Sequence, residues 1–154
     1  MTAAKSSSGL LTLRPISRTS ASTDAVWFPL DHPYVERCWT SVVGPTGVAL
    51  LRRAAVLFAT SGEPTIDLLE VARDLGITGS DSSRRMQRTL LRLQRLGFID
   101  RPTADEVDVY VDVPPLPTRE LRRSTAALRA VHTNLLRERR TEAGRPVILD
   151  RSMR

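Results

Sequence analysis

The residues of this sequence best suited to chemistry are arginines that recur at helical spacing between positions 80 and 96. Arg85, Arg88, Arg92 and Arg95 share one sector of a helix when successive residues are stepped by 100°. An arginine carries a planar fork of N–H donors, which can bind the O6 and N7 atoms of guanine or a phosphate group. The spacing therefore indicates a surface that suits an acidic partner.

The same segment carries an apolar face that would position those arginines. This face predicts one amphipathic helix over residues 80–96. Serine and aspartate residues at 80–83 supply candidate N-caps, and Gly97 stands where the helix should end. Leu91 lies outside the apolar sector. An apolar side chain at this position is explained only if a neighbouring segment covers it. The apolar sector consists of Met86, Leu90, Leu93 and Leu96.

A shorter helix is predicted just before this one, in the segment IDLLEVARDLG. Gly76 would end it, because glycine readily adopts the left-handed conformation of a helix C-cap. The two helices would then flank a short glycine-containing turn, which is a helix-turn-helix arrangement. The buried face of the shorter helix is predicted from apolar residues three and four apart: Ile66, Leu69, Val71, Ala72 and Leu75.

A two-stranded ribbon is predicted after Gly97. In VDVYVDV, valines alternate with Asp108, Tyr110 and Asp112, which is typical of a half-buried strand. The segment FIDR can pair with it through a short loop at residues 102–105. The valines that would face inward are Val107, Val109, Val111 and Val113.

The succession of L-x-x-V-A-R-D-L-G-I, a Ser/Arg-rich helix ending in R-L-G-F-I, and a short ribbon resembles the winged helix-turn-helix domains of bacterial and phage DNA-binding proteins. The preceding VVGPTGVALLRRAAVLFA is similar to the first helix of such domains in replication-initiation proteins of the DnaD kind. The expected fold is mainly α with a small β-ribbon (α+β). Domains of this kind bind DNA or self-associate, so the resemblance leaves both functions open.

Within the second helix, the predicted contacts divide along its length. The N-terminal part of a recognition helix enters the major groove, so base contacts are expected near that end. The predicted base contacts are Ser82, Ser83, Arg84, Gln87 and Arg88. Arg85 completes the predicted DNA-binding set, and Arg92 and Arg95 are expected to serve the DNA backbone.

The predicted ribbon departs from many winged helices, which present basic residues to DNA there. Its outward side offers Asp105, Glu106, Asp108 and Asp112, and carboxylates repel phosphates. Either the ribbon points away from DNA, or the domain is not used on DNA in the usual pose.

The first 116 residues divide into two parts. Residues 1–24 are rich in Ser, Thr and Ala, which predicts a disordered arm. Residues 25–116 are predicted to form the winged-helix domain, beginning with a segment whose aromatics dock onto the core. Within it, residues 45–62 are expected to form a central scaffold helix.

After three prolines, residues 117–140 are predicted to form one long helix, followed by a loose tail at 141–154. Three leucines are seven residues apart, with Val131 between the last two, and they form a narrow seam. This helix either folds back on the domain or forms a homodimer through the seam. The predicted dimerisation residues are Leu121, Leu128, Val131 and Leu135.

Composition favours a binding protein over an enzyme. The chain has 23 basic and 17 acidic residues, a formal net charge of +6, which suits nucleic acid. Cys38 is the only cysteine, and no metalloprotease, phosphate-loop or nucleophile-elbow motif occurs. We therefore expect no catalysis, no metal site, no cofactor and no membrane partner. The expected location is the cytoplasm, in association with the nucleoid if the protein binds DNA.

Two functions remain open from the sequence. The first is binding of double-stranded DNA by a transcriptional regulator or an accessory factor of replication or recombination. The second is a winged-helix module that holds proteins together through its acidic ribbon and leucine seam. The arginine face favours the first function, and the acidic ribbon favours the second.

Overall fold

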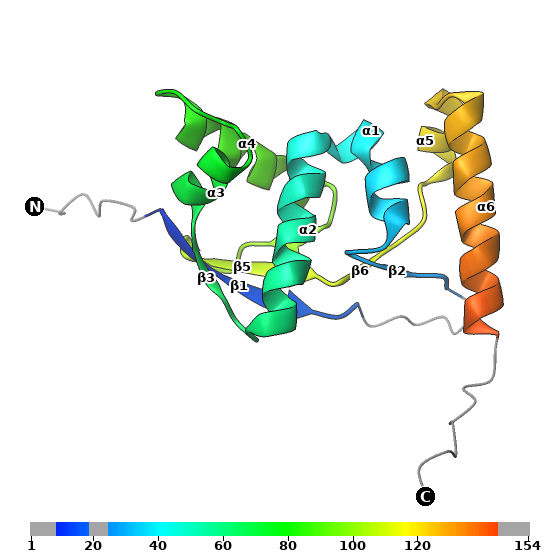
Figure 1. Cartoon of the computed structure of the whole chain (residues 1–154), viewed down its shortest axis with the longest axis horizontal. Helices are drawn as coiled ribbons and strands as arrows, with labels where there is room; N and C mark the ends of the chain where they lie inside the picture. The colour runs from blue at the N-terminus through cyan, green and yellow to red at the C-terminus, as the bar shows by residue number, and fades with distance from the viewer. Residues whose placement is uncertain (1–8, 19–24, 145–154) are drawn as a thin grey trace, which may run out of the picture.

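The computed structural model describes residues 9–18 and 25–144, and these residues form an α+β fold. Three helices lie over one face of a four-stranded sheet, and a smaller ribbon leads to two C-terminal helices at the far end of the molecule (Figure 1). The predicted α+β class is therefore confirmed.

The sheet contains two strands that the sequence did not predict, β1 and β3. Its strand order is β3-β1-β5-β4, with β1 antiparallel to β3 and parallel to β5. The strands are β1 (Leu10–Ile16), β3 (Thr65–Asp67), β5 (Glu106–Tyr110) and β4 (Ile99–Asp100). Strands β4 and β5 pair antiparallel as the predicted ribbon, with Ile99 opposite Val109.

Strand β1 corrects the prediction of a disordered arm at residues 1–24. Leu11 and Leu13 are only 4% and 5% exposed, and they face the core from the middle of the sheet. Strands β3 and β5 lie on either side of β1, so this strand supplies the hydrogen bonds that both require. Residues 1–8 and 19–24, also assigned to the arm, lie outside the described residues.

Helices α2, α3 and α4 cover the inner face of this sheet (Figure 1). Helix α2 (Pro45–Thr60) is the predicted scaffold helix, with proline in its first turn, and it buries Val48, Leu51 and Ala54. Its neighbours are α3 (Leu68–Asp74) and α4 (Ser82–Arg95).

Helix α3 begins later than its apolar spacing predicted. Ile66 belongs to β3, and Leu69 is 40% exposed instead of buried. The reason is that β3 pairs with β1 up to Asp67, whose side chain then accepts hydrogen bonds from the backbone N–H groups of Leu69 and Glu70 at 2.9 and 3.4 Å. This start directs Leu68, Val71 and Ala72 inward.

The two glycines predicted to end the helices do so. Gly76 and Gly97 have φ angles of 76° and 79°, a region in which other residues are strained. After each glycine, the chain returns a backbone N–H to the helix: Ile77 donates to Ala72 at 2.8 Å, and Phe98 donates to Leu93 at 2.9 Å. These turns also direct Ile77 and Phe98 into the core.

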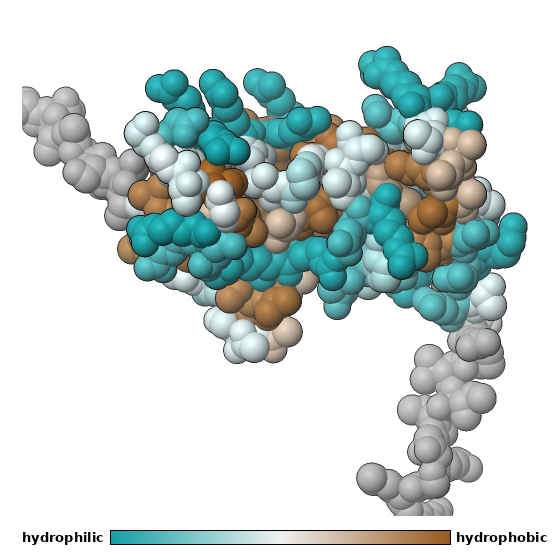
Figure 2. Space-filling model, turned by 45° about the horizontal axis from the view of Figure 1, so that its top comes forward, coloured by the Kyte–Doolittle hydropathy of each residue, from teal (hydrophilic) through white to brown (hydrophobic). Residues whose placement is uncertain are grey.

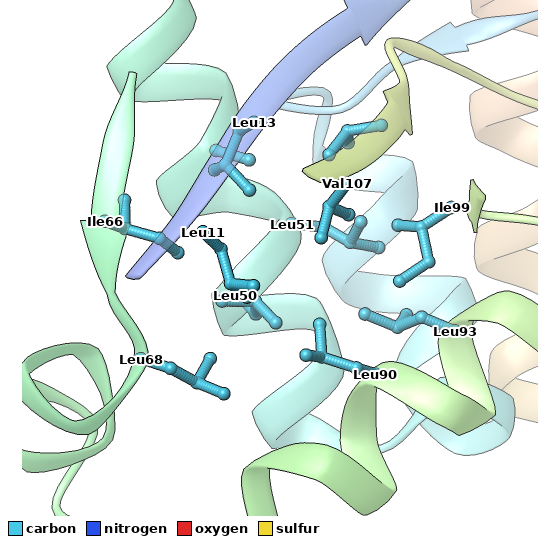
Figure 3. Close-up of a pocket in the computed structure, with 12 residues that line it drawn as sticks. Leu11, Leu13, Leu50, Leu51, Ile66, Leu68, Leu90, Leu93, Ile99 and Val107 are labelled. Carbon is cyan, nitrogen blue, oxygen red and sulfur yellow. The ribbon is translucent and has the colours of Figure 1, made fainter. Parts of the chain in front are cut away.

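The core between sheet and helices encloses a small apolar cavity of about 20 Å³ (Figure 3). Leu11, Leu13 and Val107 point into it from the sheet, and Leu51 and Leu90 point into it from the helices. A void lined only by aliphatic side chains offers a water molecule no hydrogen-bond partner, so it stays dry. The cavity is a packing defect of the core and not a binding site.

The aromatic segment docks onto this core as predicted. Strand β2 (Phe28–Pro29) pairs with β6 (Asp112–Val113), and a π-helical turn, η1 (Val35–Trp39), runs into α1 (Thr40–Val43). Phe28 and Tyr34 are fully buried and stack with ring centroids 3.9 Å apart. Trp39 packs edge-on against Phe98 at 4.9 Å.

The C-terminal segment forms two helices where one was predicted, α5 (Thr118–Arg123) and α6 (Ala126–Ala143). The break lies at Ser124, whose backbone is extended, and Thr125 then caps α6 by accepting a hydrogen bond from the Leu128 N–H at 3.2 Å. Helix α6 continues to Ala143, so the predicted tail starts too early. Residues 145–154 lie outside the described part of the chain.

The predicted dimerisation seam packs partly against the core of the same chain. Leu135 is 9% exposed and belongs to the core. The other three seam residues are partly buried and pack against the same core: Leu121, Leu128 and Val131. These contacts agree with the fold-back alternative, and the homodimer stays a prediction because Leu121, Leu128 and Val131 are only partly buried.

A hydrogen bond between Tyr34 and His132 joins α6 to the core. The Tyr34 oxygen accepts a hydrogen bond from the Leu116 N–H at 2.8 Å, and it lies 2.6 Å from His132 Nδ1. Burial raises the pKa of the Tyr34 hydroxyl, which therefore remains protonated and can donate to a neutral His132. Burial, followed by the charge of Arg140, lowers the pKa of His132.

The lowered His132 pKa predicts a loss of stability in mild acid. The unfolded chain binds a proton more readily than the folded chain, so the free energy of unfolding should fall as pH falls from about 7.5 through the lowered pKa. His132→Asn keeps an acceptor for Tyr34 but does not titrate. Urea unfolding should show a flatter pH dependence in this variant, with a remainder from His32, whose pKa burial also lowers. An unchanged dependence would exclude His132 as a source.

Candidate nucleic-acid interface

Helix α4 is held firmly by its apolar side. Met86, Leu90 and Leu93 are 0%, 3% and 1% exposed, which confirms three of the four predicted inward positions. Leu96 is 39% exposed instead, because the helix ends at Arg95 and the chain turns through Gly97. The arginine face is therefore presented by a rigid element that is packed along its length.

The solvent-facing side of α4 carries the predicted DNA-binding residues. Ser82 is half-buried, and seven others are exposed: Ser83, Arg84, Arg85, Gln87, Arg88, Arg92 and Arg95. The helix sequence contains five arginines and no acidic residue. Hydrophilic side chains stand out from the surface at the end of the molecule where α3 and α4 lie (Figure 2). The structure thus brings the five arginines and Gln87 together on one exposed face, whereas Ser82 and Ser83 lie outside this face at the N-terminal end of the helix.

This face has a centre and two flanks. At 100° per residue, Arg84, Arg88, Leu91 and Arg95 follow one another along its middle. Arg85 and Arg92 lie on one flank, and Gln87 lies on the other. The arginines in the middle row point farthest from the protein and are best placed to reach a partner.

Arg92 is partly used within the protein. Its Nη2 donates a hydrogen bond to the Val42 carbonyl oxygen in α1 at 2.6 Å. With Arg88, it borders an open groove of about 270 Å³ beside Gly44 and Thr46, where α1 meets α2. The guanidinium therefore joins α4 to α1, and its remaining N–H groups face solvent.

Arg101 belongs to this surface and was missed by the sequence interpretation. Its guanidinium donates to Gln87 Oε1 at 3.1 Å and to the Ala104 carbonyl at 2.8 Å. It therefore places a positive charge from the β4–β5 loop beside α4, and it engages the amide oxygen of a predicted base contact. The signal in the sequence was the arginine that directly follows F-I-D, at the end of the first ribbon strand.

The acidic side of the ribbon is partly neutralised by β1. Arg14 Nε donates to Asp108 Oδ1 at 2.8 Å, and this pairing raises the pKa of Arg14. Because β1 pairs with β5, Arg14 stands opposite Asp108 in the sheet register. Glu106 is half-buried and Asp105 is exposed at the ribbon loop. The acidic surface predicted from the sequence is therefore smaller than the residue count suggested.

Tyr110 forms a second cluster on the outer face of the sheet, in which the negative charge of Asp100 and the positive charge of Arg18 both lie beside it. Its hydroxyl donates to Asp100 Oδ2 at 2.6 Å, which raises the pKa of Tyr110. The Arg18 guanidinium lies 4.3 Å from the Tyr110 ring centroid, and its Nε donates to the Asp112 carbonyl at 3.2 Å. These contacts are internal to the protein and fasten the ends of β1 and β5 together.

The remaining reactive side chains are arranged for packing. Cys38 is fully buried, and burial raises the pKa of its thiol to about 11, so the reactive thiolate is scarce at neutral pH. His32 Nδ1 accepts a hydrogen bond from the Tyr34 N–H at 3.1 Å. Within residues 9–18 and 25–144, no group of three or more His, Cys, Asp or Glu residues could hold a metal ion.

In the part of the chain that the structure describes, no helix combines the length and the apolar character needed to cross a membrane. Comparison of the sequence and structure with protein-family models, curated proteins and solved structures finds no match.

Proposed function

We propose that this chain is a winged-helix protein of bacterial or phage type that binds double-stranded DNA through α4. It would act as a transcriptional regulator or as an accessory factor in replication or recombination. The observation that carries the proposal is the exposed face of α4, which has five arginines and no carboxylate and is held by a buried apolar face.

The order of elements supports the winged-helix assignment. Helix α2, strand β3, helices α3 and α4, and the β4–β5 ribbon follow one another as helix, strand, two helices and wing. A turn at residues 75–81 separates α3 from α4. Strand β1 is an addition to this plan, because it enters between β3 and β5.

The proposed mechanism follows from the position of each arginine. Helix α4 has 14 residues and is about 21 Å long, and a major groove about 12 Å wide admits such a helix. Arg84 and Arg88 lie in its first half, where they can donate paired hydrogen bonds to guanine. Arg95 lies at the C-terminal end of the middle row and Arg101 lies on the adjoining β4–β5 loop, and both suit phosphates.

The alternative is a protein-interaction module, and the contacts within the chain argue against it. It needs an acidic ribbon, but Asp108 is paired with Arg14. It also needs a free leucine seam, but Leu135 is buried and Leu128 packs against the core. Each surface thus has one residue occupied inside the protein, Asp108 in the ribbon and Leu135 in the seam, whereas the α4 face is exposed.

Binding of random-sequence duplex DNA should weaken steeply with salt, because arginines release counterions condensed on phosphates. A complex with about four phosphate contacts should lose about tenfold in affinity when the salt concentration doubles. Fluorescence anisotropy with a labelled duplex over a salt series measures this slope. No association even at low salt would remove the DNA-binding proposal and favour the interaction module.

A further inference from the structure

Leu91 is an exposed apolar side chain in the middle of a basic surface. It is 48% exposed, although the buried face of α4 is already formed by Met86, Leu90 and Leu93. Around the helix axis, it lies within about 60° of Arg84, Arg88 and Arg95. No segment of the described chain buries it, so a partner that covers the α4 face would also cover Leu91.

The surrounding charges restrict what that partner can be. The three neighbouring arginines favour a partner rich in negative charge, and Leu91 favours an apolar group within that partner. The major groove of DNA displays one such group, the C5-methyl of thymine, beside the acceptor atoms that arginine binds. Cytosine has a hydrogen at the same position and offers leucine no methyl contact.

We propose that Leu91 contacts a thymine C5-methyl group in the major groove. This inference rests on the proposed function. This contact makes the protein prefer thymine at the position that Leu91 meets. The arginines before and after Leu91 in the row then bind neighbouring base edges or phosphates. Burying one methyl group against a leucine is expected to raise affinity about fourfold.

Replacement of thymine by deoxyuridine tests the contact, because it removes the methyl group and keeps the base pairing. The probe is the preferred duplex recovered by selection from a random library, in which each thymine is replaced in turn by deoxyuridine. The parent protein should lose about fourfold in affinity at one position. Leu91→Ala should bind the thymine and deoxyuridine duplexes equally.

Leu10→Ala is the matched control. Leu10 is 47% exposed and lies on β1, where it alternates with Leu11 and so faces away from the core and α4. This variant loses the same side-chain atoms and should keep the fourfold difference between the two duplexes. Circular dichroism should show an unchanged fold in both variants, because both side chains are exposed.

Three results would overturn the inference while DNA binding stands: no preferred sequence in the selection, no effect of deoxyuridine at any position, or the same effect in Leu91→Ala. A different result removes the proposed function itself, namely failure of the parent to bind the unmodified duplex at low salt. The unmodified duplex therefore separates the two failures.

Discussion

Leu13→Asp is expected to remove most of the stability of this protein. Leu13 is 5% exposed in the central strand of the sheet, opposite the buried Val107. An unpaired carboxylate there would cost about 3–5 kcal/mol. The free energy of unfolding of a typical domain is only about 5–15 kcal/mol, so this loss is a large part of it. Urea unfolding followed by circular dichroism measures the loss.

Leu10→Asp is the control for this experiment. It introduces the same charge three residues earlier in the same strand, but at a side chain that is 47% exposed. Leu10 stands opposite Asp67 in the strand register, so the added charge should cost at most about 1 kcal/mol, well below the loss in Leu13→Asp. If the two variants were equally stable, β1 would not be part of the sheet.

Replacing both Arg84 and Arg88 by alanine is expected to have the largest effect on DNA binding. An arginine that binds a base contributes about 1–3 kcal/mol, so the double variant should bind the preferred duplex at least about 30-fold more weakly. Both arginines are exposed on a helix whose packing does not involve them, so the fold should remain. Anisotropy titrations on the selected duplex measure the loss.

Two single variants separate base contacts from general charge effects. Arg95→Ala should weaken binding to all sequences similarly, because Arg95 is assigned to the phosphates. Arg137→Ala removes one charge from an exposed position on α6, away from α4, and should have little effect. Equal and sequence-independent losses for Arg84, Arg88 and Arg95 would contradict the assignment of base contacts.

The sequence by itself determined the features that depend on neighbours along the chain. The apolar spacing of Met86, Leu90 and Leu93 predicted the buried face of α4, and Gly76 and Gly97 marked the helix ends. Alternation of valines predicted the strand containing Val107. These signals are local, because helix period, strand alternation and left-handed caps involve residues only a few positions apart.

The α4 face is also a local feature. Its residues lie within one helix, so their common exposure followed once the helix and its buried side were predicted correctly. The sequence could not show how the ends of those side chains are used. Arg92 donates to Val42 and Arg101 donates to Gln87, and these pairs are separated by 50 and 14 residues.

Only the tertiary structure decided the role of the N-terminal segment. In isolation, LLTLRPI is too short to form a stable strand, although four of its seven residues are Leu or Ile. It becomes ordered because β3 and β5 both offer backbone groups that need partners, and because the core accepts Leu11 and Leu13.

Pairing and packing between distant segments also explain the other differences between the structure and the sequence predictions. Pairing of β1 with β3 delayed the start of α3 and left Leu69 exposed. Pairing of β1 with β5 placed Arg14 against Asp108, 94 residues later, and reduced the acidic surface of the ribbon. Packing against the core buried Leu135 of the leucine seam. Contacts between distant segments form only when the whole chain is folded, because each depends on backbone and apolar groups that another segment supplies.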